Sequence, residues 1–388
     1  MYKRESREKI LEVVSGYSKK PKVAVLGTHS ALELLSGARR LGLKTVCICQ
    51  KGRESLYTDY YPEICDEVVV LRKFKDLVSP GVISEAQSEE WLLIPHRGLS
   101  SYIEHDQYEN HLPIPMVGSR QLLHIEDRHI EYNQTDLLRD AGINVPQVFS
   151  SYKDIDRLVT VKVPSAKHPL ERANFFAWDA ESFRKQADEK IRDGVILESA
   201  LAQAEIQEHV LGGYFNADFF LNPVETYRVW AEVDGKMQKQ NRQGRLWLMG
   251  YGARVQANLD GVLRLPAKIQ LQADTDTRNV EVGHLFETMR ESLIPRTTEA
   301  AEKFVAICQE KFAPGIIGVF GLQGVIDQDM QFWVYDLAPR NPGDQSLILS
   351  PYPGWTNVAD ARPGAGNMTA RMIKMAVGQK NLLAQIVT

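Results

Sequence analysis

The first third of the chain alternates short apolar runs with segments of helical periodicity. The apolar runs cover residues 22–27, 45–49, 67–71 and 91–95. Between the first two runs, leucine and alanine recur at three- and four-residue spacing through residues 30–41, which predicts an amphipathic helix. Short buried strands that alternate with helices indicate a parallel sheet covered on both faces. We therefore predict an α/β layer in this part of the chain.

A long helix and a change of pattern follow this layer. Helical periodicity predicts a helix of about twenty residues near residues 120–141, with Gly142 as its cap and Pro146 just beyond it. After Pro146 the apolar runs lengthen and favour antiparallel strands. The change places the main domain boundary near this helix, and we predict domains over residues 1–125 and 126–388.

The second part of the chain is typical of an α+β arrangement. Asp234 and Gly235 form a dipeptide that predicts a tight hairpin turn between two strands. Helices are predicted near residues 299–311 and 367–377. The strand-like runs are residues 158–163, 210–221, 229–233, 246–250, 317–326 and 331–337.

Composition and charge exclude several classes of protein. Of 388 residues, 44% are hydrophobic and 25% are charged, which is enough apolar material for buried cores. The 46 basic and 50 acidic side chains give a net charge of -4, which argues against a broad surface for nucleic acid. No apolar run approaches the roughly 20 residues that span a bilayer, and the first residues lack an apolar signal core. We expect a cytoplasmic protein without nucleic-acid or membrane partners.

The four cysteines are too few for a disulfide scaffold. Cys47 and Cys49 fall on one predicted strand, and we expect them on opposite faces, an arrangement that suits neither a disulfide nor zinc. Cys65 and Cys308 lie in apolar contexts. All four are expected to be reduced residues that pack in the interior.

Polar residues follow two of the predicted parallel strands. His29 lies in the sequence GTHS of residues 27–30, and His96 lies in IPHRG of residues 94–98. Because ligands bind beyond the carboxyl ends of open parallel sheets, both turns are expected to face one crevice. A helix N-terminus there would favour a phosphate or carboxylate. Two ordinary turns with solvated side chains would give the same pattern, so both interpretations stay open.

A second group of polar residues lies on two neighbouring predicted strands. Gln323 and Asp336 would present two oxygen ligands, and Arg340 follows shortly after. Mg²⁺ takes few protein oxygens and completes its shell with water and phosphate. Arg340 would then stabilise charge on a transferred phosphoryl group. A solvated sheet face could carry the same residues, so the spacing leaves this site open.

A third group begins with Lys162, which lies inside a predicted strand. A lysine there needs an anion such as an ATP phosphate, unless its side chain reaches solvent along the surface. Further along, residues 205–213 (EIQEHVLGG) could be a hinge that pairs its backbone with an adenine edge, or an edge strand that ends in a glycine turn.

The order of these features resembles the ATP-grasp ligases. More narrowly, the chain resembles the archaeal-type formate-dependent synthetases that formylate aminoimidazole carboxamide ribonucleotide in purine biosynthesis. The resemblance runs nearly end to end, and its most specific stretch is NLDGVLRLPAK at residues 258–268. It implies a Rossmann-like pre-ATP-grasp domain over residues 1–125, then an ATP-grasp fold whose small lobe covers about residues 145–215. It also implies ATP, formate and the ribonucleotide as small-molecule partners, and a homo-oligomer.

The resemblance implies a role for several residues, carried over by position. The ribonucleotide would be bound by His29, Ser100 (or Gly98), Asn258 and Arg264. ATP would be held by Lys162, Glu208, His209, Val210 and Tyr214. Mg²⁺ or Mn²⁺ would be ligated by Gln323 and Asp336, and the catalytic residues would be Arg340, Lys162 and Arg254.

The chain departs from the family pattern mainly on the ATP side. Residues 165–174 contain no glycine where the family has a glycine-rich loop, and close approach of backbone to phosphate is harder without it. Tyr214 replaces a polar ribose contact, Asp336 replaces a glutamate, and residues 341–345 replace a glycine-rich stretch. Two alternatives therefore stay open: an ATP-grasp ligase with another acid or amine, and a ribonucleotide-binding paralogue without ATP turnover.

Overall fold

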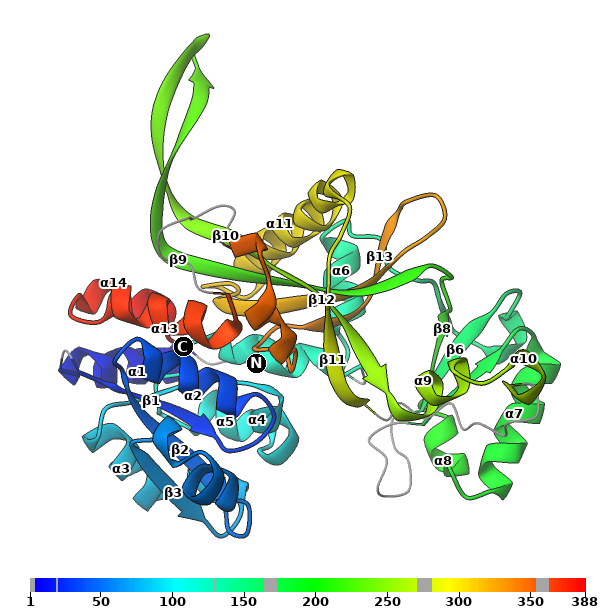
Figure 1. Ribbon diagram of the computed structural model, residues 1–388, viewed down its shortest axis with the longest axis horizontal. Coiled ribbons are helices and arrows are strands. Elements are labelled where there is room, and N and C mark those ends of the chain that lie inside the picture. Colours follow the sequence, from blue (N-terminus) through cyan, green and yellow to red (C-terminus); the bar gives the residue numbers. More distant parts are fainter. Residues whose placement is uncertain (1–3, 19, 129, 164–172, 271–280, 354–362) are drawn as a thin grey trace.

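The protein is built around three β-sheets, seen together in Figure 1. The computed structural model describes residues 4–18, 20–128, 130–163, 173–270, 281–353 and 363–388. None of the helices in these ranges is both long and apolar enough to cross a membrane.

The first sheet is parallel, as predicted, and its strand order is β3-β2-β1-β4. Apolar side chains project from both faces of the sheet and pack against the helices that cover each face, so two separate hydrophobic cores form. The strands are β1 (Lys22–Leu26), β2 (Lys44–Gln50), β3 (Glu67–Leu71) and β4 (Trp91–Leu93). The helices are α1 (Arg4–Gly16), α2 (Ala31–Arg40), α3 (Pro80–Ser88), α4 (Arg97–Tyr102) and α5 (His105–Asn110). Short helical turns are η1 (Leu56–Tyr60), η2 (Pro62–Ile64) and η3 (Phe74–Val78).

A small antiparallel sheet follows, with strand order β5-β8-β6-β7 and a core of its own. Its strands are β5 (Val148–Phe149), β6 (Val159–Val163), β7 (Ala173–Ala177) and β8 (Glu205–Glu208). The helical elements beside it are η5 (Tyr152–Asp154), α7 (Ala180–Arg192) and α8 (Glu198–Leu201). This sheet, with its two helices, coincides with the predicted small lobe, whereas the exact domain boundaries stay a prediction.

The large sheet is antiparallel, with strand order β11-β10-β9-β12-β13. Its strands are β9 (Gly213–Val233), β10 (Lys236–Gln256), β11 (Glu281–Glu287), β12 (Gly318–Ile326) and β13 (Phe332–Ala338). The helices of this part are α6 (Gln134–Asp140), α9 (Ala257–Leu263), α10 (Ala267–Gln270), α11 (Ile294–Lys311), α13 (Ala365–Ala376) and α14 (Lys380–Ile386). Short turns are η4 (Arg120–Glu126), η6 (Glu291–Leu293) and η7 (Gln345–Leu349).

Strands β9 and β10 form one long ribbon of 21 residues each. Its outer half projects well beyond the body of the molecule (Figure 1). The predicted Asp234-Gly235 turn is confirmed, because both residues have positive φ, 50° and 74°, as a tight hairpin turn requires. The separate runs predicted at residues 210–221 and 229–233 belong to one continuous strand.

Residues from the far end of the chain complete the first sheet's layer. Helix α13 packs against α2, where Gly37 and Gly366 let the two backbones approach closely. Beyond α14, the amides of Met116 and Thr388 each donate to the other residue's carbonyl, at 3.1 Å and 2.9 Å. The buried Arg120 side chain also donates to the Thr388 carbonyl at 2.9 Å. The N-terminal layer is therefore made from both ends of the described chain.

Two predictions about local structure are wrong. The helix predicted near residues 120–141 is two elements, η4 and α6, because Asn133 caps α6 through its side chain, which accepts from the Thr135 amide at 2.8 Å. Cys47 and Cys49 share one face of β2, since residues two apart on a strand point the same way, and their Sγ atoms lie 3.6 Å apart.

Candidate active site

A cavity of about 450 Å³ opens between the small sheet and the large sheet. The small sheet contributes Lys162 of β6 and the segment that follows β8. The large sheet contributes the first residues of β9 and the end of β10. All six residues predicted for ATP or catalysis in this region line it, namely Lys162, Glu208, His209, Val210, Tyr214 and Arg254. The structure therefore brings together residues that span more than 90 positions of the sequence, from Lys162 to Arg254.

Aromatic rings form one end of this cavity. The ring of His209 stands edge-on to Phe176 at 5.0 Å and stacks with Tyr214 at 5.9 Å, while Tyr214 contacts Tyr335 at 5.6 Å. Burial and the nearby Lys162 charge lower the pKa of His209, which keeps its imidazole neutral at pH 7. A neutral aromatic slot of this kind suits the flat base of a nucleotide.

A chain of charged groups extends from Lys162, which lines the cavity. Lys162 Nζ donates to Gln207 Oε1 at 2.5 Å and lies 3.5 Å from Glu205. Arg128 bridges Glu205 at 2.5 Å and Asp336 at 2.7 Å, so it joins the small sheet to the large one. Sequence reasoning missed Arg128, because it lies in an irregular segment between η4 and α6 where no pattern marks it.

The two predicted metal ligands are direct neighbours. Gln323 of β12 pairs with Asp336 of β13 across the sheet, and Arg254 Nη2 donates to Gln323 Oε1 at 2.5 Å. Asp336 is held by Arg128, so both candidate ligands already turn their oxygens toward cationic groups. The described residues contain no group of three or more His, Cys, Asp or Glu side chains that could hold a metal alone. Two oxygens from adjacent strands fit a Mg²⁺ ion that also takes phosphate and water.

A second cluster gathers around His29 and His96, as the two predicted turns required. Their rings stack at 5.5 Å, and His29 Nδ1 lies 3.0 Å from Ser30 Oγ. Burial, with the adjacent Arg340 charge, lowers the pKa of His29 to about 2, and burial lowers that of His96 to about 4. His96 is fixed by the Leu26 carbonyl and by the Gly98 amide, each at 3.0 Å. Both imidazoles are therefore neutral hydrogen-bonding groups.

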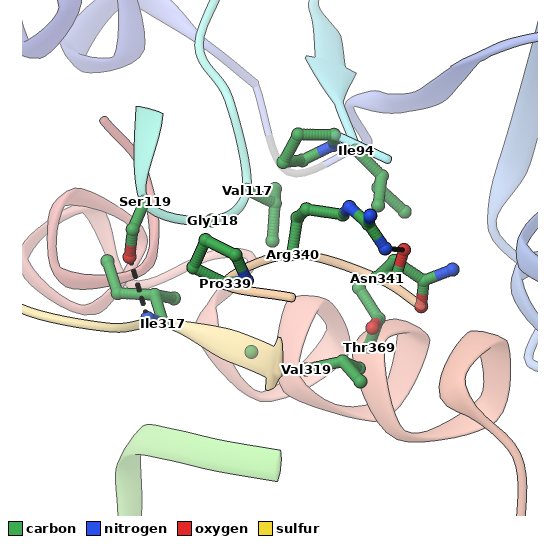
Figure 2. A pocket seen from close by; sticks show the side chains of 12 residues that line it. Ile94, Val117, Gly118, Ser119, Ile317, Val319, Pro339, Arg340, Asn341 and Thr369 are labelled. Carbon is green, nitrogen blue, oxygen red and sulfur yellow. Dashed lines mark hydrogen bonds between the residues drawn. The ribbon is translucent and has the colours of Figure 1, made fainter. Parts of the chain in front are cut away.

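The loop after β13 carries Arg340 and Asn341, which lie near Ile94 and Val117 in Figure 2. Arg340 is paired with the buried Glu126 at 2.9 Å, and Glu126 also binds Arg97 at 2.8 Å. Asn341 Nδ2 donates to Ser30 Oγ at 2.7 Å. Arg340 therefore lies near His29, and among the described residues its ion pair is with Glu126.

The remaining predicted residues are Ser100, Arg264 and Asn258. Ser100 is within α4, where its hydroxyl donates to the Arg97 carbonyl at 3.2 Å. Arg264 is exposed at the end of α9, and its binding role stays a prediction. Asn258 lies in α9, but its side chain is outside the described part of the structure, as are residues 164–172 of the glycine-free segment.

Two family models match the chain, "Protein of unknown function (DUF1246)" over residues 23–149 and "Domain of unknown function (DUF1297)" over residues 182–388. The chain is 35% identical over 349 residues to the 5-formaminoimidazole-4-carboxamide-1-(beta)-D-ribofuranosyl 5'-monophosphate synthetase of Methanopyrus kandleri, covering 89% of this chain and 90% of that protein. It is 31% identical over 386 residues to the protein of the same name from Methanocaldococcus jannaschii, covering 99% of each.

Solved structures show the same fold. An IMP biosynthesis protein PurP from Thermococcus kodakaraensis superposes with a TM-score of 0.66 at 22% identity, over 94% of this chain and all of that chain. The ADP complex of purK, an N5-carboxyaminoimidazole ribonucleotide synthetase, gives a TM-score of 0.56 at 11% identity, over 92% of this chain and 77% of that one.

The three sheets and the cavity between two of them define an ATP-grasp enzyme, an ATP-dependent ligase. The predicted fold class is therefore confirmed. The chain belongs to the family of the 5-formaminoimidazole-4-carboxamide ribonucleotide synthetases.

Proposed function

We propose that this enzyme formylates 5-aminoimidazole-4-carboxamide ribonucleotide with formate and ATP, in the synthesis of IMP. Formate would take the γ-phosphoryl group of ATP to give formyl phosphate and ADP. The ribonucleotide's exocyclic amine would then attack the formyl carbon and release phosphate. The observation that carries the proposal is the convergence of Lys162, Tyr214 and Arg254 on one cavity beside Gln323 and Asp336. We place the reaction in the cytoplasm, where its small-molecule substrates are available.

The chain's own residues would act mainly by positioning and by neutralising charge. Lys162 and Arg254 line the cavity and would face the phosphates, while Arg128 holds Asp336. The carboxylate and amide oxygens that these cations now bind mark where anionic oxygens are accepted. Neutral His29 would hydrogen-bond to the ribonucleotide. The mixed anhydride is sensitive to water, so the buried face between the two sheets would protect it.

The metal requirement belongs to the same proposal. Gln323 and Asp336 would hold Mg²⁺ or Mn²⁺, which neutralises phosphate charge when it is bound. Replacing Asp336 with Asn should abolish ADP release while the affinity for the ribonucleotide stays near the wild-type value, measured by calorimetry. An equal loss of both would contradict the assignment of Asp336 to the metal.

An omission experiment tests the reaction itself. Purified protein with Mg²⁺-ATP should release ADP over many turnovers only when formate and the ribonucleotide are both present, because formyl phosphate needs an acceptor before the next cycle. Mass spectrometry should show the ribonucleotide gaining one formyl group. Release of ADP with another acid or amine, and none with this pair, would favour a different ATP-grasp ligase. Ribonucleotide binding without ATP binding would favour the paralogue that lacks ATP turnover.

We also propose that the protein is a homo-oligomer that uses the projecting half of the β9–β10 ribbon. An isolated two-stranded ribbon is marginal in water, yet this one leaves Trp230 62% exposed and Met237 61% exposed. Residues 226–243 carry four basic and two acidic side chains, in a chain whose net charge is -4, so the ribbon complements a second copy's body. Changing Trp230 to Ser should shift the mass by analytical ultracentrifugation toward the monomer, whereas an unchanged mass would exclude the ribbon from the interface.

A further inference from the structure

The carboxyl group of Asp218 is buried in the middle of the large sheet. The residue is 1% exposed, and neither of its carboxylate oxygens has a hydrogen-bond partner among the described residues. Leaving a buried carboxyl group without a partner destabilises a fold, and most such groups are paired. An unpaired one in the centre of a sheet therefore points to a ligand.

Glycines on the neighbouring strands make room for this carboxyl group and for a second one. Asp218 pairs with Gly321 of β12, where a side chain would put its first carbon 2.5 Å from Asp218 Oδ1. At Gly252 of β10, a side chain would overlap Asp344 Oδ2, which is also buried and without a partner. Its other oxygen accepts from the Ser346 amide at 2.9 Å. Both carboxyl groups therefore lie beside glycines, where the neighbouring strands have no side chain.

The cations near this pair are bound elsewhere. Arg340 and Arg254 both act on Asp218 through their charge, but Arg340 is paired with Glu126, and Arg254 binds Gln323 and Glu281. A structural role for Asp218 would have one of these arginines as its partner. Instead, Asp218 has two arginines nearby but forms no hydrogen bond or ion pair with either of them.

The surroundings of the pair favour protonation. Burial, then the charge of Asp344, raises the pKa of Asp218 well above its usual range, and Glu33 of α2 adds to this effect. Burial likewise raises the pKa of Asp344, which Glu281 raises further and His284 lowers, and burial brings the pKa of Glu33 to about 7. Burial and the mutual repulsion of the two carboxyl groups thus raise the pKa of both, so each binds a proton more readily than an exposed aspartate does.

The pair lies between the two halves of the site. Asn216 is two residues before Asp218 on the same face of β9, and it lines the cavity together with Gly252. On the other side Gly343, the neighbour of Asp344, meets the His29 ring, since a side chain there would lie 3.1 Å from it. The two carboxyl groups therefore lie between residues that line the cavity and residues that contact His29.

We propose that Asp218 accepts the proton that the substrate amine loses as it attacks the formyl carbon, with Asp344 sharing that proton. This inference rests on the proposed function. The amine nitrogen forms the new C–N bond, the bond between formyl carbon and phosphate oxygen breaks with its electron pair on phosphate, and the amine proton passes to the Asp218 carboxylate. A positioned base of this kind typically contributes about 100- to 10,000-fold to a rate.

The two half-reactions can be measured separately in the full-length enzyme. Hydroxylamine traps formyl phosphate made from ATP and formate, and single-turnover assays with the ribonucleotide measure transfer. Asp218→Asn should keep trapping within about twofold of the wild-type rate, while transfer falls at least about 100-fold. The wild-type transfer rate should rise with pH as the pair loses its proton, and the variant should lose this dependence. Asp218→Glu should restore part of the transfer rate.

The controls separate this inference from the proposed function. Asp329→Asn, in the exposed β12–β13 turn, should match the wild type in both assays. Absence of formylated product in the wild-type enzyme would overturn the proposed function. With an active wild type, transfer by Asp218→Asn at the wild-type rate, or equal loss of trapping and transfer, would overturn only the proton-acceptor role. If Asp218→Asn does not fold, the Asp344→Asn variant provides the test. It should shift the pH dependence of formyl transfer while formyl phosphate is still trapped. An unchanged pH dependence of transfer would refute the proton-acceptor role of Asp218.

Discussion

At the scale of single residues, the site is organised by arginines that bridge acids from different elements. The Arg128 side chain is only 8% exposed and holds Glu205 of the small sheet together with Asp336 of the large sheet. Burying such a triad gives little net stability, but removing one partner leaves charges buried without compensation. The cost of losing Arg128 should therefore be high.

The first prediction concerns this triad. Replacing Arg128 with Leu should lower the free energy of unfolding by about 3–5 kcal/mol, because Glu205 and Asp336 would stay buried without a cation. Urea unfolding at pH 7 measures the change. Arg128→Lys, which keeps the charge but cannot bridge two acids in the same way, should lose less. Equal losses in the two variants would show that packing, not charge, dominates here.

A second prediction at this scale follows from the buried histidines. The pKa of His96 is lowered from 6.5 to about 4, so between these pH values the unfolded chain binds a proton that the folded chain does not. Stability should therefore fall as pH falls, with His96 contributing about 1.4 kcal/mol per pH unit below pH 6.5. Guanidinium unfolding from pH 7 to 5 should show a shallower decline for His96→Asn. Parallel curves for the two proteins would contradict the assignment.

How much of the site could be predicted depends on how local its signals are. His29, Lys162, Gln323 and Asp336 each follow or lie within a strand whose pattern is readable, and the structure places them as expected. Arg128, Asp218 and Asp344 gave no signal, because their importance lies in contacts with residues far away in the chain. Arg264 was assigned by resemblance alone; it is exposed, and its role stays a prediction.

At the scale of elements, the same distinction between local and distant signals applies. Strands of the parallel sheet were predicted closely, since continuous apolar runs mark them. The ribbon of β9 and β10 was fragmented in the prediction, because Pro223 and the polar residues of 222–228 separate the two apolar runs of β9. The helix predicted near residues 120–141 failed because periodicity cannot detect the break before Asn133.

A third prediction tests the bare face of the large sheet. Gly252→Ala would place a methyl group on the Asp344 carboxyl group, so the free energy of unfolding should fall by about 1–3 kcal/mol and formyl transfer should fall with it. Gly283→Ala in β11 is the matched control, because nothing lies within 4 Å of the added carbon. Urea unfolding and the transfer assay measure both effects. A Gly252→Ala enzyme as stable and active as the control would show that this contact can relax freely.

At the scale of the whole molecule, the small sheet and the large sheet meet around a cavity and through Arg128. A ligand that contacts both sheets stabilises the folded state by mass action, in proportion to its concentration over its dissociation constant. The two sheets should therefore respond to ATP as one unit.

The fourth prediction uses this linkage. Mg²⁺-ATP at 100 times its dissociation constant should raise the free energy of unfolding by about 2.7 kcal/mol, seen as a higher Tm in a thermal scan. At the same ATP concentration, Lys162→Ala should lose most of this shift, because the lysine lines the cavity. Lys185→Ala, an exposed lysine of α7, should keep the full shift. A shift retained in Lys162→Ala would remove that lysine from the ATP site.

The pairing of Met116 with Thr388, and the packing of α13 on α2, have a consequence for how the protein is made. On the ribosome the strands of the first sheet emerge well before α13 and Thr388, which pack against this layer. These strands therefore remain partly uncovered until translation has passed residue 365. Chaperones that shield nascent apolar surface would act on the first sheet throughout this interval.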